Sequence, residues 1–234
     1  MNLCCVLLSK EKLVSIPCDH VAMKLEICYL PTITMASSIA DVRQNFSDLA
    51  INPIAQINWE QFNYKPEVGF KIAYTDDGIL LNYLVNEKYI KACYTDINSP
   101  VYRDSCVEFF ISFNGEEYYN FEFNCIGTPF AAFGTSNKTT RKPLPIDILE
   151  SIQIDSLIHT TKAASSWNMF IYIPLKVLVH HSLTSLHGIR CTGNFYKCGD
   201  ELPVPHFLSW NPIDAEAPNF HLPNFFGELF FVKS

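Results

Sequence analysis

Two glutamates interrupt neighbouring apolar segments of this chain. Glu108 lies in DSCVEFFISF (104–113), and Glu122 lies in YYNFEFN (118–124). Burying a carboxylate is unfavourable unless it is hydrogen-bonded, so both positions need a reason. Carboxylates either accept hydrogen bonds from hydroxyl groups or work in pairs as the acid and base of a glycosidase. The pair is therefore the first candidate for chemistry.

The elements around the glutamates predict that they share one face of a sheet. Side chains alternate across a strand, and Asn114-Gly115 is a strong hairpin turn between the two segments. Glu108 then lies on one side with Cys106, Phe110 and Ser112, and Glu122 with Tyr118, Asn120 and Asn124. The segment 188–196 adds Arg190, Thr192, Asn194 and Tyr196 to the polar side. This face is either a solvated outer face, with Arg190 paired to a carboxylate, or a ligand face.

Cysteine and histidine spacing favours no metal site. The nine cysteines are odd in number and form no CxxC pair, so we expect buried free thiols. A disulfide between Cys106 and Cys125 would need both side chains on one face. The seven histidines form no H-x3-H pair on a predicted helix, but His206 and His221 flank Trp210 and one of them is a candidate for a ligand edge.

Composition restricts the classes of protein. The chain has 234 residues, is 48% hydrophobic and 14% aromatic, and carries a formal net charge of −7 without a Lys/Arg cluster. These values predict a folded, strand-rich chain and argue against a nucleic-acid surface or an anionic membrane partner. The apolar run CCVLL (4–8) is too short to span a membrane, and no basic residue precedes it, so no clear signal peptide is found. The cell envelope, the periplasm and the cytoplasm all stay open as locations.

Periodicity predicts an all-β chain: an antiparallel β-sandwich with jelly-roll or immunoglobulin-like layers and one or two short helices. Ser38 is expected to cap a helix with Ile39, Val42 and Phe46 on one face. Strands are expected at 105–113, 118–125, 128–133, 148–154, 158–162, 167–173, 188–196 and 226–232, a hairpin at 69–85, a strand around Trp59, and a short helix after Pro174. The segment 135–146 is expected to be an exposed loop. Residues 1–22 are predicted to be a disordered extension, and 23–234 a single domain.

Four stretches together resemble the family 9 carbohydrate-binding modules, in particular the stand-alone, Bacteroides-type members. They are DSCVEFFISF, YYNFEFNCIGT, GIRCTGNFYKCG and WNPIDAEAPNFHLPNFFGELFF. The resemblance covers roughly residues 36–234. It implies a β-sandwich that binds sugars, typically glycan chain ends, between aromatic side chains above polar residues of the strands, without catalysis.

The resemblance also implies roles for individual residues. The family's strand glutamate corresponds to Glu108, and an aromatic platform before that motif falls at Tyr102, where such modules often have tryptophan. A basic residue of the family falls near Glu122, so an acid stands where a base is expected. Trp210 is the candidate for the second platform. Some members bind structural calcium, for which Asp76, Asp77, Asp96 and Asp104 are possible ligands.

The sequence therefore predicts non-catalytic carbohydrate binding in support of carbohydrate catabolism. In this hypothesis Tyr102 and Trp210 stack on the sugar, Glu108, Glu122, Asn124 and Asn194 hydrogen-bond its hydroxyls, and Arg190 orients a carboxylate or contacts the ligand. The expected partner is a carbohydrate, with no nucleic acid and no membrane span, and the oligomeric state is open. The alternatives are a glycosidase that uses Glu108 and Glu122, and a β-sandwich that binds haem or a protein.

Overall fold

A computed structural model describes residues 22–233 of the chain. The predicted N-terminal extension, residues 1–22, lies outside this range except for its last residue. Neither helix within residues 22–233 has the length and apolarity that a membrane span requires.

Strands make up most of the described chain. They are β1 (Lys24–Tyr29), β2 (Asn52–Pro53), β3 (Gln56–Ile57), β4 (Glu67–Tyr74), β5 (Gly78–Glu87), β6 (Cys106–Ser112), β7 (Tyr118–Asn124), β8 (Pro129–Gly134), β9 (Lys142–Pro143), β10 (Gln153–Thr160), β11 (Ser165–Pro174), β12 (Arg190–Cys198), β13 (Phe207–Ser209) and β14 (Gly227–Phe231). The helices are α1 (Ile39–Phe46) and α2 (Ile146–Leu149), with 3-10 turns at Glu60–Phe62, Val101–Arg103, Lys138–Thr140, Leu175–Val177 and Pro223–Phe225.

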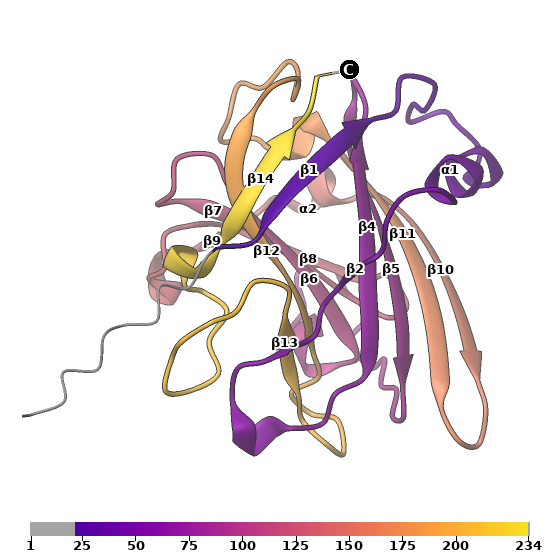
Figure 1. Cartoon of the computed structure of the whole chain (residues 1–234), viewed down its shortest axis with the longest axis vertical. Coiled ribbons are helices and arrows are strands. Elements are labelled where there is room, and N and C mark those ends of the chain that lie inside the picture. Colours follow the sequence, from indigo (N-terminus) through magenta and orange to yellow (C-terminus); the bar gives the residue numbers. More distant parts are fainter. Residues whose placement is uncertain (1–21, 234) are drawn as a thin grey trace, which may run out of the picture.

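The strands form one mixed sheet in the order β10-β11-β5-β4-β1-β14-β12-β6-β7-β8-β9. The two halves are joined by β1, which crosses between β4 and β14 and runs parallel to both (Figure 1). The prediction of a purely antiparallel sandwich was therefore wrong at this strand. The first strand pairs with the last one and with β4, and its long-range partners leave no local signal in the sequence.

The halves of the sheet face each other and enclose the main core. Inward-facing residues of β4, β5 and β11 meet those of β6, β7 and β12, and Phe70 stacks on Phe195 with ring centroids 3.7 Å apart. The predicted alternation is confirmed, because Val107, Phe109 and Ile111 all lie in this core. Close packing of aromatic rings at this interface holds the two halves at a fixed distance.

The outer face of β6, β7 and β12 is also covered. Phe110 and Tyr196 from this face lie in a second cluster with Trp59, Phe220 and Phe226, which come from elsewhere in the chain. The Pro-rich segment after β12 supplies most of the cover, so every residue of β6 and β7 is buried. A sheet face that is covered in this way keeps little contact with water, which excludes the solvated outer face considered above.

Several local predictions are confirmed. Ser38 caps α1, and its hydroxyl accepts a hydrogen bond from the Asp41 amide at 3.2 Å. The β6–β7 hairpin turns through Gly115 with a φ of 80°, a conformation that glycine adopts without strain. The predicted strand at 148–154 was wrong: Pro145 precedes the short helix α2, and β10 begins only at Gln153.

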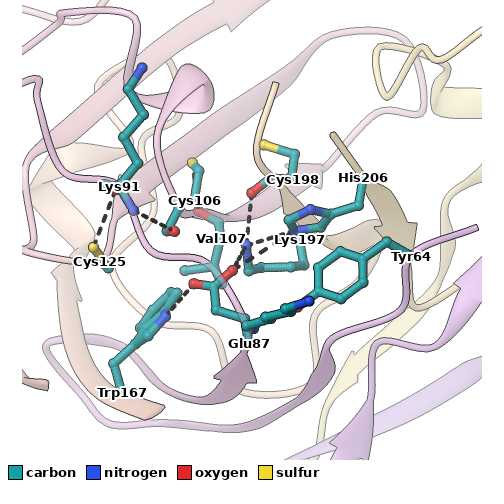
Figure 2. Close-up of polar contacts among 12 residues, drawn as sticks. Tyr64, Glu87, Lys91, Cys106, Val107, Cys125, Trp167, Lys197, Cys198 and His206 are labelled. Atoms are coloured by element: carbon teal, nitrogen blue, oxygen red, sulfur yellow. Dashed lines mark hydrogen bonds and ion pairs between the residues drawn. The ribbon is translucent and has the colours of Figure 1, made fainter. Parts of the chain in front are cut away.

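A buried ion pair closes one end of the core (Figure 2). Lys197 of β12 places its ammonium 2.9 Å from the Glu87 carboxylate at the end of β5, and neither side chain is exposed. Glu87 also accepts a hydrogen bond from the Trp167 indole at 2.7 Å, and Lys197 lies 2.9 Å from the His206 imidazole. These contacts link β5, β11 and β12 to the segment that follows β12.

Candidate functional site

Glu108 and Glu122 lie directly opposite each other in the sheet. The register of β6 and β7 pairs Glu108 with Glu122, and both side chains point to the outer face of the sheet. Asn120, two residues before Glu122 and on the same face, donates from Nδ2 to Glu122 Oε1 at 2.8 Å. The prediction that the polar rows of the two strands share one side is confirmed.

A pocket of about 460 Å³ opens above this row. Glu108, Asn120 and Glu122 form its floor, and the chain segments that cover the outer face form its walls. The remaining lining residues are Tyr102, Phe130, Ala132, Lys138, Arg141, Pro143, Cys198, Asp200, Phe207, Pro218, Asn219, Phe220 and His221. This volume lies within the range of about 300–1,000 Å³ that is typical of small-molecule sites.

Arg141 is the most firmly held cation of the pocket. Its guanidinium donates to the carbonyl oxygens of Gly134 and Thr135 at 2.7 and 2.8 Å and to Asn120 Oδ1, and it lies 3.9 Å from the Tyr118 ring centroid. The pairing of β8 with β9 brings the arginine over the sheet. Because Asn120 accepts from Arg141 and donates to Glu122, the amide is oriented from both ends.

Unused hydrogen-bonding capacity remains at the floor. Within residues 22–233, Glu122 Oε2 and Arg141 Nε are buried without a hydrogen-bond partner. Most buried polar atoms in folded proteins have a partner, so one unpaired acceptor and one unpaired donor beside a pocket are informative. The polar groups of the floor are therefore not all satisfied by the protein itself.

Burial controls the charge of the floor. Loss of water raises the pKa of both Glu108 and Glu122, and the charge of Glu122 raises that of Glu108 further. The carboxyl of Asp200, at the side of the pocket, has a pKa raised to about 6, again mainly by burial. Neighbouring carboxylates that are closed off from water do not ionise independently, so the floor carries less negative charge than three free carboxylates would.

Aromatic rings form much of the wall. Phe220 stacks on Tyr196, with centroids 4.2 Å apart and planes at 11°, which fixes its position over the sheet. His221 Nδ1 lies 2.9 Å from the Tyr118 hydroxyl, and burial lowers the pKa of this imidazole to about 3, so the ring is neutral. Tyr102 is 37% exposed and stands at the rim.

The structure brings together three of the seven residues predicted from the sequence: Tyr102, Glu108 and Glu122 line the pocket. The other four lie elsewhere. Asn124 uses its side chain to hold the backbone of Tyr94 and Thr128 together. Arg190 lies over the ring of Phe230, 3.9 Å from its centroid and outside the pocket.

Asn194 and Trp210 have structural positions. The Asn194 amide binds backbone groups of Asn211 and Phe225, which ties the Pro-rich segment to β12. Trp210 is only 2% exposed and packs edge-on against Phe195 in the main core. It follows β13, whose pairing with β12 turns the indole inward, so the expectation of an exposed platform on a loop did not match its position.

Lys138, Arg141 and Phe220 line the pocket although the sequence did not predict them there. The first two lie in the segment that was predicted to be an exposed loop, and the third lies in the Pro-rich segment. Loop composition carries no signal about which strand a loop returns to. Asn120 was placed on the polar face but was not among the predicted site residues, and of the two candidate histidines it is His221 that lines the pocket.

Possible metal donors converge at one place in the described chain. Among residues 22–233, Cys106, Glu108 and Cys198 are the only group of three or more His, Cys, Asp or Glu donors whose atoms all lie within 4.8 Å of one another. The four aspartates considered for calcium are not part of such a group, and calcium binding stays a prediction. Cys106 and Cys125 face opposite sides of the sheet, so they do not pair.

Comparison with known proteins agrees with this architecture. The sequence model of carbohydrate-binding family 9 matches residues 38–231. A solved structure from Bacteroides uniformis ATCC 8492, of a protein named as a candidate carbohydrate-binding protein, is 37% identical, with a TM-score of 0.84. The match covers 90% of this chain and 99% of that one.

More distant structures share the fold. A family 9 carbohydrate-binding module from Caldicellulosiruptor kristjanssonii in complex with glucose has a TM-score of 0.57 at 14% identity, covering 90% of this chain and 96% of the module. Its complex with cellotriose has a TM-score of 0.55 at 13% identity, covering 91% and 95%. No curated protein matches the sequence. The family match over nearly all of the described residues, together with the close structural relative, means that this chain belongs to carbohydrate-binding family 9.

Proposed function

We propose that this chain binds a carbohydrate, without catalysis, in the pocket above β6 and β7. The observation that carries the proposal is the pocket itself, whose floor holds the carboxyl groups of Glu108 and Glu122 and the Asn120 amide beneath aromatic walls. Sugar hydroxyls both donate and accept hydrogen bonds, so they suit a floor that offers carboxyl and amide groups with a guanidinium beside them. A phosphate offers mainly acceptors and so does not match the carboxyl acceptors of the floor, and a fatty acid chain has no groups along its length to bond with the floor.

The walls suit the apolar faces of a sugar ring. Phe220 and Tyr102 supply aromatic surface from two different segments, and Phe130 and Phe207 add to it. C–H groups of a pyranose pack on such rings while its hydroxyls reach the polar floor. The pocket therefore offers one apolar and one hydrogen-bonding surface to the same ligand.

The size of the pocket favours a small saccharide or the end of a glycan chain. A volume of about 460 Å³ bounded by several chain segments holds a few rings at most, whereas the interior of a polymer needs a groove open at both ends. A chain end also presents the free hydroxyls that the floor requires. We place the protein in carbohydrate catabolism, because small saccharides and free chain ends are the products of enzymes that shorten glycans.

Glycosidase activity is the less favoured alternative. Glu108 and Glu122 lie side by side on one floor, on neighbouring strands, and do not approach a scissile bond from two sides. Membership of a family of binding modules points the same way. Binding of haem has no specific support, because the pocket imidazole of His221 is already engaged with Tyr118.

Isothermal titration calorimetry tests the proposal. The panel contains glucose, cellotriose and a range of other mono- and oligosaccharides. We expect saturable binding to one class of sugar, and a loss of affinity of at least about tenfold in Glu122→Ala, because a hydrogen bond to a charged or strongly polarised group contributes roughly 1.5–3 kcal/mol.

Arg190→Ala is the matched control, since this arginine belongs to the same sheet but lies outside the pocket. It should keep the wild-type affinity. The absence of binding across a broad panel, or an equal loss in both variants, would contradict the proposal. Hydrolysis of chromogenic glycosides by the wild-type protein would contradict its non-catalytic part.

A further inference from the structure

Two thiols and a carboxylate meet on the outer face of the sheet, at the edge of the pocket. Cys106 and Glu108 are two residues apart on β6 and therefore share a face, and Cys198 on β12 lies directly opposite Cys106. Their ligand atoms all lie within 4.8 Å of one another. Figure 2 shows the sulfur atoms of both cysteines on the same side, away from the Glu87 carboxylate.

The shortest contact of the Cys198 thiol is with the carboxylate. Cys198 Sγ donates to Glu108 Oε1 at 3.1 Å and lies 3.5 Å from the Tyr102 carbonyl oxygen, and Cys106 Sγ lies 3.6 Å from the Val107 carbonyl oxygen. An ordinary buried cysteine packs as a small apolar side chain. A carboxylate within reach of two thiols is not required by packing and costs free energy in a buried position.

We propose that Cys106, Glu108 and Cys198 bind a thiophilic divalent cation, with Zn²⁺ as the best match. Two thiolates and one carboxylate are typical zinc donors, with metal–sulfur distances of about 2.3 Å and metal–oxygen distances of about 2.0–2.2 Å. In a tetrahedral site, such distances separate the donor atoms by roughly 3.5–3.8 Å. The observed donors are already within 4.8 Å, so side-chain rotations without strand movement are enough.

The fourth coordination position faces the pocket, because Cys198 and Glu108 both line it. A bound ion would hold a water molecule there, or a hydroxyl group of a pocket ligand, as zinc sites with an open position do. The site is thus distinct from a closed structural zinc site. It would add a coordinating centre to a floor that otherwise recognises its ligand by hydrogen bonds alone.

Charge balance is compatible with such a site. Two thiolates, one carboxylate and a dication leave one net negative charge, and Lys138 and Arg141 line the same pocket with positive charge. The thiols release their protons when the ion binds, as metal coordination requires. Lys138 and Arg141 therefore stabilise the loaded state electrostatically.

Cobalt titration of the whole protein tests the site. The wild-type chain is purified with a chelator, freed of it, kept reduced, and titrated with CoCl₂, whose tetrahedral thiolate complexes absorb visibly. We expect one equivalent of Co²⁺ to produce thiolate-to-cobalt charge-transfer and d–d bands, and ZnCl₂ to bleach them because zinc binds such donors more tightly. Wild-type protein that gives no such bands would overturn the proposal.

Cysteine variants show which residues bind the ion. Cys106→Ser and Cys198→Ser should each weaken Co²⁺ binding by at least about tenfold. Cys191→Ser, a buried thiol on the inner face of β12, is the matched control and should keep the wild-type bands. Every other cysteine stays in these variants, so bands that persist in both would place the ion elsewhere and overturn the proposal.

X-ray absorption of the zinc-loaded wild type decides the question if a serine variant does not fold. Two sulfur neighbours with oxygen completing the shell support the site, and none or four sulfur neighbours overturn it. The result is independent of sugar binding, because no saccharide is present. Protein that binds Co²⁺ but no sugar would refute the proposed function alone, and the reverse result would refute the metal site alone.

Discussion

At the scale of single residues, Arg141 organises the floor of the pocket. Its guanidinium donates to several carbonyl oxygens and to Asn120 while its plane lies over Tyr118. Only a planar group with several fixed donors makes these contacts together. Asn120 in turn orients Glu122, because its amide donates a hydrogen bond to the Glu122 carboxylate. The arginine therefore orients the polar side chains at the floor of the proposed site.

Arg141→Lys should weaken sugar binding by about tenfold or more while the chain stays folded. A lysine keeps the charge but cannot donate to Asn120 and the carbonyl oxygens at once, so Asn120 loses its fixed orientation. Calorimetry against the best sugar of the panel measures the effect. Arg43→Lys, at an exposed ion pair with Asp155 outside the pocket, is the matched control. Equal affinities of wild type and Arg141→Lys would show that the guanidinium does not organise the site.

Trp210 shows at the same scale why an aromatic residue in a Pro-rich segment is not automatically a binding platform. Its ring packs against Phe70 and Phe195 and lies so close to Gly227 that a Cβ there would come within 2.5 Å of the indole. The aromatic walls come from Phe220 and Tyr102 instead. Residue type alone does not distinguish a ring that stacks on a ligand from one that fills the core.

At the scale of elements, the buried pair of Glu87 and Lys197 connects the two halves of the sheet. Glu87 ends β5 in one half, and Lys197 lies near the end of β12 in the other. Both side chains are fully buried, so each charge depends on the other for compensation. Buried pairs of this kind add little net stability compared with apolar residues, but breaking one is strongly destabilising.

Glu87→Gln should lower the free energy of unfolding by about 3–5 kcal/mol, because the Lys197 ammonium then stays buried without a counter-charge. Adding Lys197→Met to this variant removes the uncompensated charge and should recover part of the loss. Urea denaturation at pH 7 measures both variants. If the double variant had a lower free energy of unfolding than Glu87→Gln alone, the uncompensated Lys197 charge would not explain the loss.

At the scale of the whole molecule, the buried imidazole of His206 makes stability depend on pH. It faces the Lys197 ammonium and, at 4.0 Å, the Glu87 carboxylate. Burial first, and the charge of Lys197 second, lower its pKa from the usual 6.5 to about 3. The neutral ring accepts from Lys197 at Nε2 and donates from Nδ1 to the Val204 carbonyl oxygen at 3.2 Å.

The unfolded chain takes up a proton at this histidine below pH 6.5, and the folded chain does not until pH approaches 3. The contribution of His206 is therefore fully present above pH 6.5 and is lost as the pH falls, by about 1.4 kcal/mol per pH unit. His206→Gln keeps an acceptor for Lys197 but does not titrate. Urea denaturation at pH 7.5, 5.5 and 4.5 measures the free energy of unfolding of both proteins. As the pH falls, the wild type should lose stability relative to His206→Gln. A constant difference would contradict this assignment.

The sequence by itself determined most of the long strands, the faces of β6, β7 and β12, and the side-by-side position of Glu108 and Glu122, because alternation and the Asn114-Gly115 turn are local signals. It also determined the family through four stretches of matching residues. Alternation and turn type depend only on residues close together in the sequence. They are enough to predict which side chains of adjacent strands share a face of the sheet.

Only the tertiary structure decided what lies above those strands. The return of Arg141 over β8, the burial of Trp210 and the parallel pairing of β1 with β4 and β14 all join segments far apart in sequence. Such contacts form because they bury apolar surface and satisfy backbone groups across the whole fold, and a residue's neighbours along the chain do not encode them. For the same reason, the meeting of Cys106, Glu108 and Cys198 appears only when β6 and β12 are paired.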